Sequence, residues 1–253
     1  MKVSLFITCV ADQFSPQAGV SAVRLLRAAG CDVSFPMSQT CCGQPAYNAG
    51  YHDAARSVAK HLMNVFERSE YVVTPSGSCG AMLHHYSELF KADSVQLRRA
   101  WSLAERTYEL SQFLVEVLGV ESTGADLSGL RIAYHDSCHA MRSLGVREQP
   151  RKLLQAAGAE LVSWDEACCG FGGLFSVKMP EISSAMMDRK LDSLLAHACV
   201  DALTSTDLGC LLQLGGGLER RKNGPPWFHI AQLLDPTSEA IRDLRERWAV
   251  EAG

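Results

Sequence analysis

Arg24-Leu-Leu-Arg-Ala-Ala-Gly-Cys-Asp-Val33 and Lys152-Leu-Leu-Gln-Ala-Ala-Gly-Ala-Glu-Leu161 are two copies of one pattern within a chain of 253 residues. The first copy continues to Cys41-Cys42-Gly43, and the second continues to Cys168-Cys169-Gly170. Because both copies carry the same order of apolar run, glycine and paired cysteines, the sequence predicts two similar units related by duplication.

The cysteines follow the same repeat. Eight of the ten cysteines fall into it, and each cysteine of the second copy follows its partner by 127 to 131 residues. The first copy holds Cys9, Cys41, Cys42 and Cys79, and the second holds Cys138, Cys168, Cys169 and Cys210. A duplicated set of four thiols predicts two four-thiolate sites. The remaining two, Cys31 and Cys199, have no counterpart, and we expect both to fill the apolar core.

Composition is typical of a globular protein and excludes several classes. Hydrophobic residues make up 47% of the chain and charged residues 21%, and the net charge of −4 argues against a nucleic-acid groove. No apolar run is long enough for a membrane span, and the first residues lack a signal-peptide pattern, so we expect a cytoplasmic protein. In a reducing compartment, cysteines serve as metal ligands or redox groups more often than as disulfides.

Strand and helix patterns alternate along both copies. Strands are expected at 3–9, 31–37, 71–75, 132–138, 160–164 and 202–206, and helices at 16–30, 51–68, 150–158 and 180–197. This alternation predicts an α/β fold of two duplicated βαβ-type domains, with parallel sheets related by a pseudo-two-fold. We expect the domains to span 1–118 and 131–253, joined by a linker at 119–130. The thiols then lie at the carboxyl ends of parallel strands, where such sheets bind ligands.

The Cys-Cys-Gly segments favour metal binding over disulfide formation. Adjacent cysteines are poorly spaced for a disulfide with each other, and the glycine lets the backbone approach a metal closely. Soft thiolates select zinc or an iron–sulfur cluster. Zinc sites usually contain short Cys-x2–4-Cys steps, whereas this chain has no Cys-x-x-Cys. The wide spacing favours a multinuclear cluster, and zinc stays open as the second interpretation.

The spacing Cys-x31-Cys-Cys-Gly-x35-Cys resembles the CCG cysteine-rich domain family. This family includes the cysteine-rich component of heterodisulfide reductase, the iron–sulfur component of glycolate oxidase and the lactate-utilization A proteins, and a tandem pair with nothing fused is most similar to the last. The resemblance implies that the eight repeated cysteines bind one or two iron–sulfur clusters, of the 4Fe–4S kind in the relatives. One departure is that Met82 and Gln213 stand where heterodisulfide reductase relatives have a fifth cysteine.

The resemblance also implies a function. The chain would be an electron-transfer oxidoreductase subunit of a multi-protein complex that converts L-lactate to pyruvate, inactive on lactate by itself. Its partners would include a ferredoxin-type iron–sulfur protein. Two alternatives stay open: a heterodisulfide-reductase-like thiol/disulfide redox subunit, and a zinc-stabilised scaffold subunit. No catalytic residue and no lactate pocket can be identified from the sequence.

Polar residues near the cysteines allow more than one interpretation. His135, Asp136 and His139 flank Cys138, where they either tune a cluster or relay a proton, or simply end a strand with backbone hydrogen bonds. His84 and His85 are expected to begin a surface helix. The Gly215-Gly216-Gly217 run lacks a phosphate-loop pattern and is expected to be a mobile, solvated loop.

Overall fold

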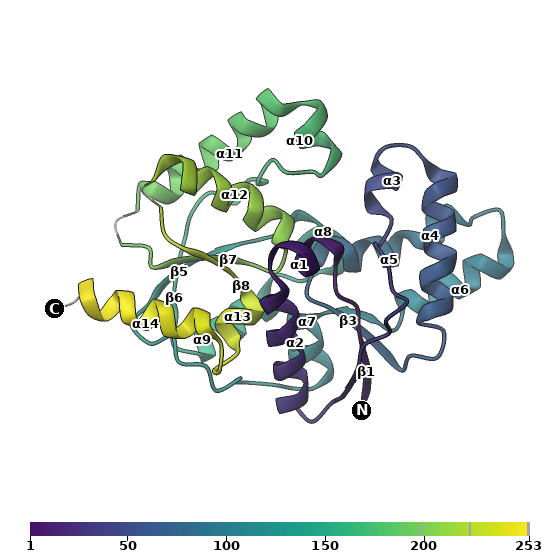
Figure 1. The fold of residues 1–253 in the computed structure, drawn as a ribbon, viewed down its shortest axis with the longest axis horizontal. Helices are drawn as coiled ribbons and strands as arrows, with labels where there is room; N and C mark the ends of the chain where they lie inside the picture. Colours follow the sequence, from purple (N-terminus) through teal and green to yellow (C-terminus); the bar gives the residue numbers. More distant parts are fainter. Residues whose placement is uncertain (198, 223, 252–253) are drawn as a thin grey trace.

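The computed structural model describes residues 1–197, 199–222 and 224–251. Its framework is two four-stranded sheets, whose arrangement is drawn in Figure 1. Every strand pair is parallel, and the orders are β2-β1-β3-β4 and β6-β5-β7-β8. The strands are β1 (Lys2–Leu5), β2 (Asp32–Ser34), β3 (Tyr71–Thr74), β4 (Thr107–Glu109), β5 (Arg131–His135), β6 (Glu160–Val162), β7 (Ala202–Ser205) and β8 (Trp227–His229). The α/β class with duplicated parallel sheets is thereby confirmed.

Helices connect successive strands in both halves. The first half contains α1 (Cys9–Phe14), α2 (Pro16–Ala28), α3 (Gln44–Asn48), α4 (His52–Val65), α5 (Gly77–Leu89), α6 (Ser94–Ala104), α7 (Leu110–Gln112) and the π-helix η1 (Phe113–Val117). The second half contains α8 (Cys138–Leu144), α9 (Glu148–Ala156), α10 (Leu174–Lys178), α11 (Pro180–Leu195), α12 (Leu208–Arg221), α13 (Ile230–Leu234) and α14 (Glu239–Glu251). The main difference is that α5 and α6 lie between β3 and β4, whereas α12 is the helix described between β7 and β8. None of the helices in the described ranges is both long and apolar enough to cross a membrane.

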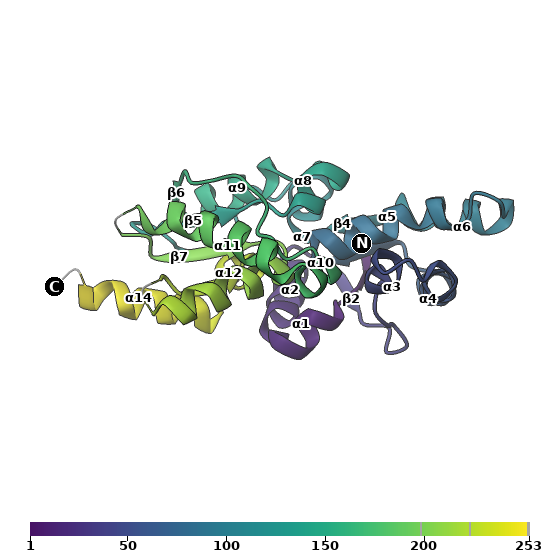
Figure 2. The same cartoon turned by 90° about the horizontal axis from the view of Figure 1, so that it is seen from above.

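One apolar core joins the two halves. Leu25 and Leu26 of α2 belong to the same buried cluster as Leu233 and Leu234 of α13, and α2 packs directly against α13. Figure 2 shows α6 and α14 at opposite ends of the molecule, with α2 between them. The two sheets are therefore held as one body, so that residues of one half can complete a site in the other.

The predicted first strands are too long at their carboxyl ends. The strands end at Leu5 and His135, and the thiol-bearing residues Cys9 and Cys138 instead begin α1 and α8. The local cause in the first half is Thr8, whose Oγ1 accepts a hydrogen bond from the N–H of Ala11 at 3.1 Å and so starts a helix. Both thiols remain just beyond the carboxyl ends of the central strands.

Helix α2 begins at the first residue of its predicted range, 16–30, and ends two residues before that range does. Pro16 is the first residue of α2, and Gly30 follows its end with a φ of +83°, which an L side chain rarely adopts. Leu26 is buried, whereas Val20 is 42% exposed. Small residues such as Ala22 form much of the buried face, so α2 lies close against α13.

Two loop and helix predictions are wrong. Gly215-Gly216-Gly217 is not a solvated loop but lies within α12. A Cβ on Gly215 would lie 2.3 Å from Nε1 of Trp227, and one on Gly217 would lie 2.5 Å from Cδ1 of Leu191. These glycines let α12 pack closely against β8 and α11. His84 and His85 do not begin a helix either, because α5 already begins at Gly77.

Candidate metal centres

The thiols of the first copy lie at the carboxyl edge of the first sheet. Cys9 begins α1 after β1, Cys41 and Cys42 follow β2, and Cys79 lies in the first turn of α5 after β3. This is the edge at which parallel sheets bind ligands, because each strand ends there in a loop. Three separate loops thus bring the four predicted thiols of the first copy together.

The four thiols of the first copy form a connected group. Cys9 interacts with Cys41, Cys41 with Cys42, and Cys42 with Cys79. A cavity of about 130 Å³ is lined by all four, and Phe171 of the second half supplies part of its opposite wall. This group, called site one below, therefore has four sulfur donors facing a single space.

The electrostatics of site one favour a bound cation. Hydrogen bonds from Cys42 and Cys9 lower the pKa of the Cys41 thiol to about 2, and its Sγ also accepts the N–H of Gly43 at 3.5 Å. Hydrogen bonding to Cys41 and Cys79, followed by burial, raises the pKa of Cys42. Because thiols bind a metal as thiolates, metal binding at this group would release protons.

The second copy repeats this arrangement as site two. Cys138 begins α8 after β5, Cys168 and Cys169 follow β6, and Cys210 lies in the first turn of α12 after β7. Hydrogen bonds from Cys138 and Cys169 lower the pKa of Cys168 to about 2, and the N–H of Gly170 approaches Sγ of Cys168 at 3.5 Å, the same distance as in the first copy. The duplication seen in the sequence is therefore preserved at the level of the thiols.

The glycine that follows each cysteine pair has a specific steric role. Gly43 and Gly170 both have a φ of +84°. A Cβ on Gly170 would lie 2.5 Å from the carbonyl oxygen of Ser183 in α11, and one on Gly43 would lie 3.2 Å from Cγ1 of Val58 in α4. Glycine thus allows the turn both to adopt a left-handed conformation and to pack against the following helix.

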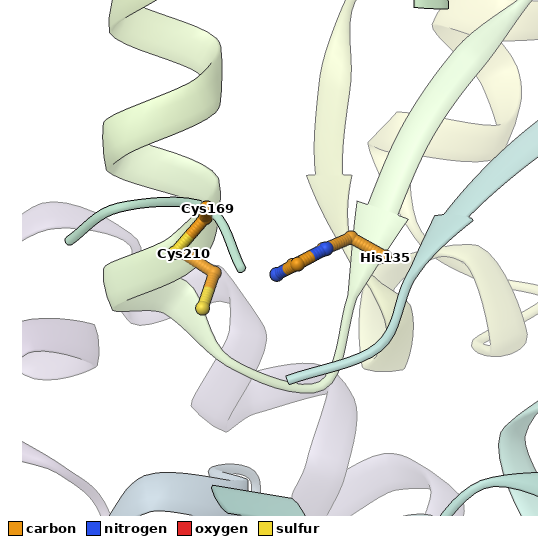
Figure 3. A group of neighbouring side chains, drawn as sticks. All are labelled: His135, Cys169 and Cys210. Carbon is orange, nitrogen blue, oxygen red and sulfur yellow. The ribbon is translucent and has the colours of Figure 1, made fainter. Parts of the chain in front are cut away.

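His135 is a member of site two whose role the sequence alone does not decide. Its ring nitrogen and the sulfur atoms of Cys169 and Cys210 all lie within 4.8 Å of one another, and all three side chains are buried (Figure 3). Burial lowers the pKa of His135 to about 3, so the imidazole is neutral and able to bind a metal. The available sequence signal is its position three residues before Cys138.

The other polar residues beside Cys138 have different surroundings. Asp136 forms an ion pair with Arg151, with an oxygen–nitrogen distance of 2.5 Å, and so is held by α9 rather than facing the thiols. Nδ1 of His139 lies 3.8 Å from Sγ of Cys138. His139 is therefore close to the outer edge of site two, whereas Asp136 has a structural partner.

The two unpaired cysteines differ from each other. Cys31 is buried in the core beside Leu25 and Leu26, as predicted. Cys199 is exposed and has a φ of +60°, so the prediction that it fills the core is wrong. Its place in the loop between α11 and β7 keeps it away from the apolar layer.

Comparison with known proteins identifies the family. The family model described as a cysteine-rich domain, CCG, matches residues 3–84 and 132–215, one match for each copy. The chain belongs to the CCG cysteine-rich domain family. The two matches cover both thiol groups and both central strands, so the family's domain occurs twice here.

Several curated proteins are similar to this chain over nearly their whole length. Lactate utilization protein A of Geobacillus sp. (strain WCH70) is 49% identical over 238 residues, which cover 93% of this chain and 99% of that protein. Lactate utilization protein A 2 of Bacillus cereus (strain 03BB102) is 47% identical, with coverage of 92% and 98%. A solved structure of a hypothetical protein from Helicobacter pylori has a TM-score of 0.61 at 13% identity, covering 96% of this chain and 50% of that one, and shows likeness of fold alone.

Proposed function

We propose that the protein is an electron-transfer subunit of a multi-protein complex that oxidises L-lactate to pyruvate, with an iron–sulfur cluster bound at each site. The observation that carries the proposal is the convergence of four thiols from three loops, found twice in one chain. The choice of lactate is supported by the relatives, which are named for lactate utilization.

The donor set fits an iron–sulfur cluster. Four thiolates are sufficient ligands, and such a cluster supplies one-electron transfer when bound. Cys42 and Cys169 are 3% and 2% exposed, so the protein shields these ligands from water. Cys9 is exposed, and this leaves one face of site one open toward a partner protein. A protein that receives electrons from one neighbour and passes them to another needs such a face.

The surroundings of the thiols also bear on the compartment and the partners. All ten cysteines are free, which supports a reducing compartment such as the cytoplasm. The sequence contains no ferredoxin-type run of cysteines, so partner proteins, including a ferredoxin-type iron–sulfur protein, would connect this chain to the lactate site.

The first test is chemical analysis of protein purified without oxygen. We expect iron and acid-labile sulfide together, with the visible absorbance of iron–thiolate charge transfer, because the sites have soft sulfur donors. Zinc without sulfide in a colourless protein would instead support the scaffold role, and would overturn the electron-transfer proposal.

The second test concerns lactate. The purified chain should not oxidise L-lactate with a dye acceptor, because removal of two electrons and two protons needs more than a one-electron centre. With the partner proteins restored, L-lactate should reduce the iron–sulfur centres of this chain.

In cells lacking their own lactate utilization protein A, the wild-type chain should restore growth on lactate and the Cys42→Ser variant should not. Oxidation of lactate by the homogeneous chain would contradict the proposal.

A further inference from the structure

His135 gives site two a potential ligand that has no other partner. The side chain is 1% exposed, and among the residues that the structure describes neither ring nitrogen has a hydrogen-bond partner. A buried polar group without a partner costs free energy, so a binding partner for the ring is expected at this place. The sulfur atoms of Cys169 and Cys210, within 4.8 Å, mark where that partner lies.

Neighbouring side chains hold the ring in this direction. Nε1 of Trp164 donates a hydrogen bond to the carbonyl oxygen of Tyr134 at 2.9 Å. The fixed indole then meets the His135 ring edge to face, with ring centroids 6.1 Å apart. Oγ of Ser205 donates to the carbonyl oxygen of His135 at 2.8 Å and anchors the end of β5. The imidazole consequently points from β5 toward the two cysteines (Figure 3).

Lys190 places a buried cation beside the same group. The residue is 1% exposed, and its ammonium lies 4.1 Å from the centroid of the Trp164 ring. It donates a hydrogen bond to the carbonyl oxygen of Asp165. A buried cation is stable only near compensating negative charge; Asp165 supplies part of it, and a centre bound by Cys169 and Cys210 would supply more.

The corresponding positions around site one are apolar. Phe6, three residues before Cys9, takes the place of His135 and packs on Phe66 with ring centroids 5.6 Å apart. Met37, four residues before the first paired cysteine, takes the place of Trp164 and is 85% exposed.

The position of Lys190 is also apolar in the first copy. The contacts of Gly43 with Ala55 and of Gly170 with Ser183 align α4 with α11. In this alignment Leu62, which is fully buried, stands where the second copy has Lys190. The histidine, the tryptophan and the lysine therefore form a set that only site two possesses.

We propose that His135 is a ligand of the metal centre at site two, which makes it a mixed thiolate–imidazole site, whereas site one is bound by thiolates alone. This inference rests on the proposed function. Histidine ligation raises the reduction potential of an iron–sulfur centre relative to ligation by cysteine alone. Site two is then the electron acceptor within the chain, and electrons pass from site one to site two.

Pulsed electron paramagnetic resonance tests the ligand directly. Protein labelled in histidine with the heavy nitrogen isotope is purified without oxygen, reduced, and compared with the His135→Phe and His139→Ala variants. Phenylalanine is the residue of the first copy, and His139 is the matched control because it also approaches a thiol of site two. Wild-type protein and His139→Ala should show a strong through-bond nitrogen coupling, and His135→Phe should lose it while its higher midpoint potential falls toward that of site one.

The outcomes separate this inference from the proposed function. Normal iron and sulfide content with no through-bond histidine coupling in the wild type would overturn the ligand role of His135 and leave the electron-transfer proposal standing. Persistence of the coupling in His135→Phe would likewise overturn the ligand role of His135 and leave the electron-transfer proposal standing. Absence of iron and sulfide from the wild-type protein would overturn both. The wild-type measurement needs no variant, so a folding defect in His135→Phe does not prevent the decision.

Discussion

The carboxylate of Asp207 in the second half caps a helix of the first half: its Oδ2 accepts the backbone N–H of Ser78 at 2.6 Å. Asp207 precedes α12, but its side chain does not cap that helix. The same oxygen also accepts Oγ of Ser137 at 3.2 Å, next to Cys138. One buried carboxylate therefore connects the first turn of α5, which carries Cys79 of site one, with Ser137, which precedes Cys138 of site two.

Replacing this carboxylate should weaken the whole molecule. Asp207→Ala leaves the partly buried N–H of Ser78 without this acceptor, and we expect a loss of about 1–3 kcal/mol in the free energy of unfolding. Urea unfolding measures it. Asp207→Asn should lose less, because an amide oxygen accepts the same bonds. Asp93→Ala, which removes an exposed cap of α6, is the control and should cost about 1 kcal/mol. Equal stability of Asp207→Ala and wild type would contradict the role of this contact.

The two sites should lose metal independently. Cys42→Ser and Cys169→Ser each remove one buried thiolate, and each should lower the iron content by roughly half, because the ligands of each site come from one copy. Iron and sulfide analysis of both variants measures this. Loss of all iron from either single variant would point instead to one shared cluster. Cys31→Ala is the control, with full iron and a cost of about 1 kcal/mol or less, since Cys31 only fills the core.

Gly170 should be required for the turn that carries Cys168 and Cys169. In Gly170→Ala the new Cβ meets the carbonyl oxygen of Ser183 at 2.5 Å, so α11 or the turn must move. Gly145 is a matched control, because its φ is +69° and nothing lies within 4 Å of a Cβ built there. We expect Gly145→Ala to cost about 1–2 kcal/mol for the backbone conformation alone and to keep its iron. Gly170→Ala should be less stable than Gly145→Ala and should lose iron from site two. Equal stability and equal iron content of the two variants would count against this steric role.

Local sequence pattern and the period of the repeat are enough to predict the duplicated cysteines, the parallel sheets and the helix α2 between Pro16 and Gly30. Other features depend on contacts between distant residues. Gly215 lies within α12, where its missing side chain leaves room for the ring of Trp227. Asp207 caps the helix that begins at Gly77, which no local pattern around Asp207 indicates. His135 has two interpretations at the level of sequence, because its burial and its missing partners arise only when Trp164 packs against it.

Stability should depend on pH through Glu109, which is fully buried at the end of β4. Its Oε2 accepts the N–H groups of Ser111 at 2.8 Å and Gln112 at 3.2 Å, yet burial outweighs these bonds and raises its pKa to about 7. Between an unfolded pKa of about 4.3 and this value the native state binds more protons than the unfolded state, so stability falls as pH rises through that window.

Glu109→Gln should remove this dependence, because an amide accepts the same two bonds without ionising. Relative to wild type, the variant should gain stability between about pH 4 and pH 7, by at most about 4 kcal/mol. Urea unfolding across this range measures the difference between the two proteins, so contributions from other groups cancel. His229 is one such group: burial lowers its pKa to about 4, so its contribution is lost as pH falls. The exposed carboxylate variant Glu121→Gln should follow wild type, and parallel pH curves for Glu109→Gln and wild type would show that the pKa of Glu109 is not raised in the fold.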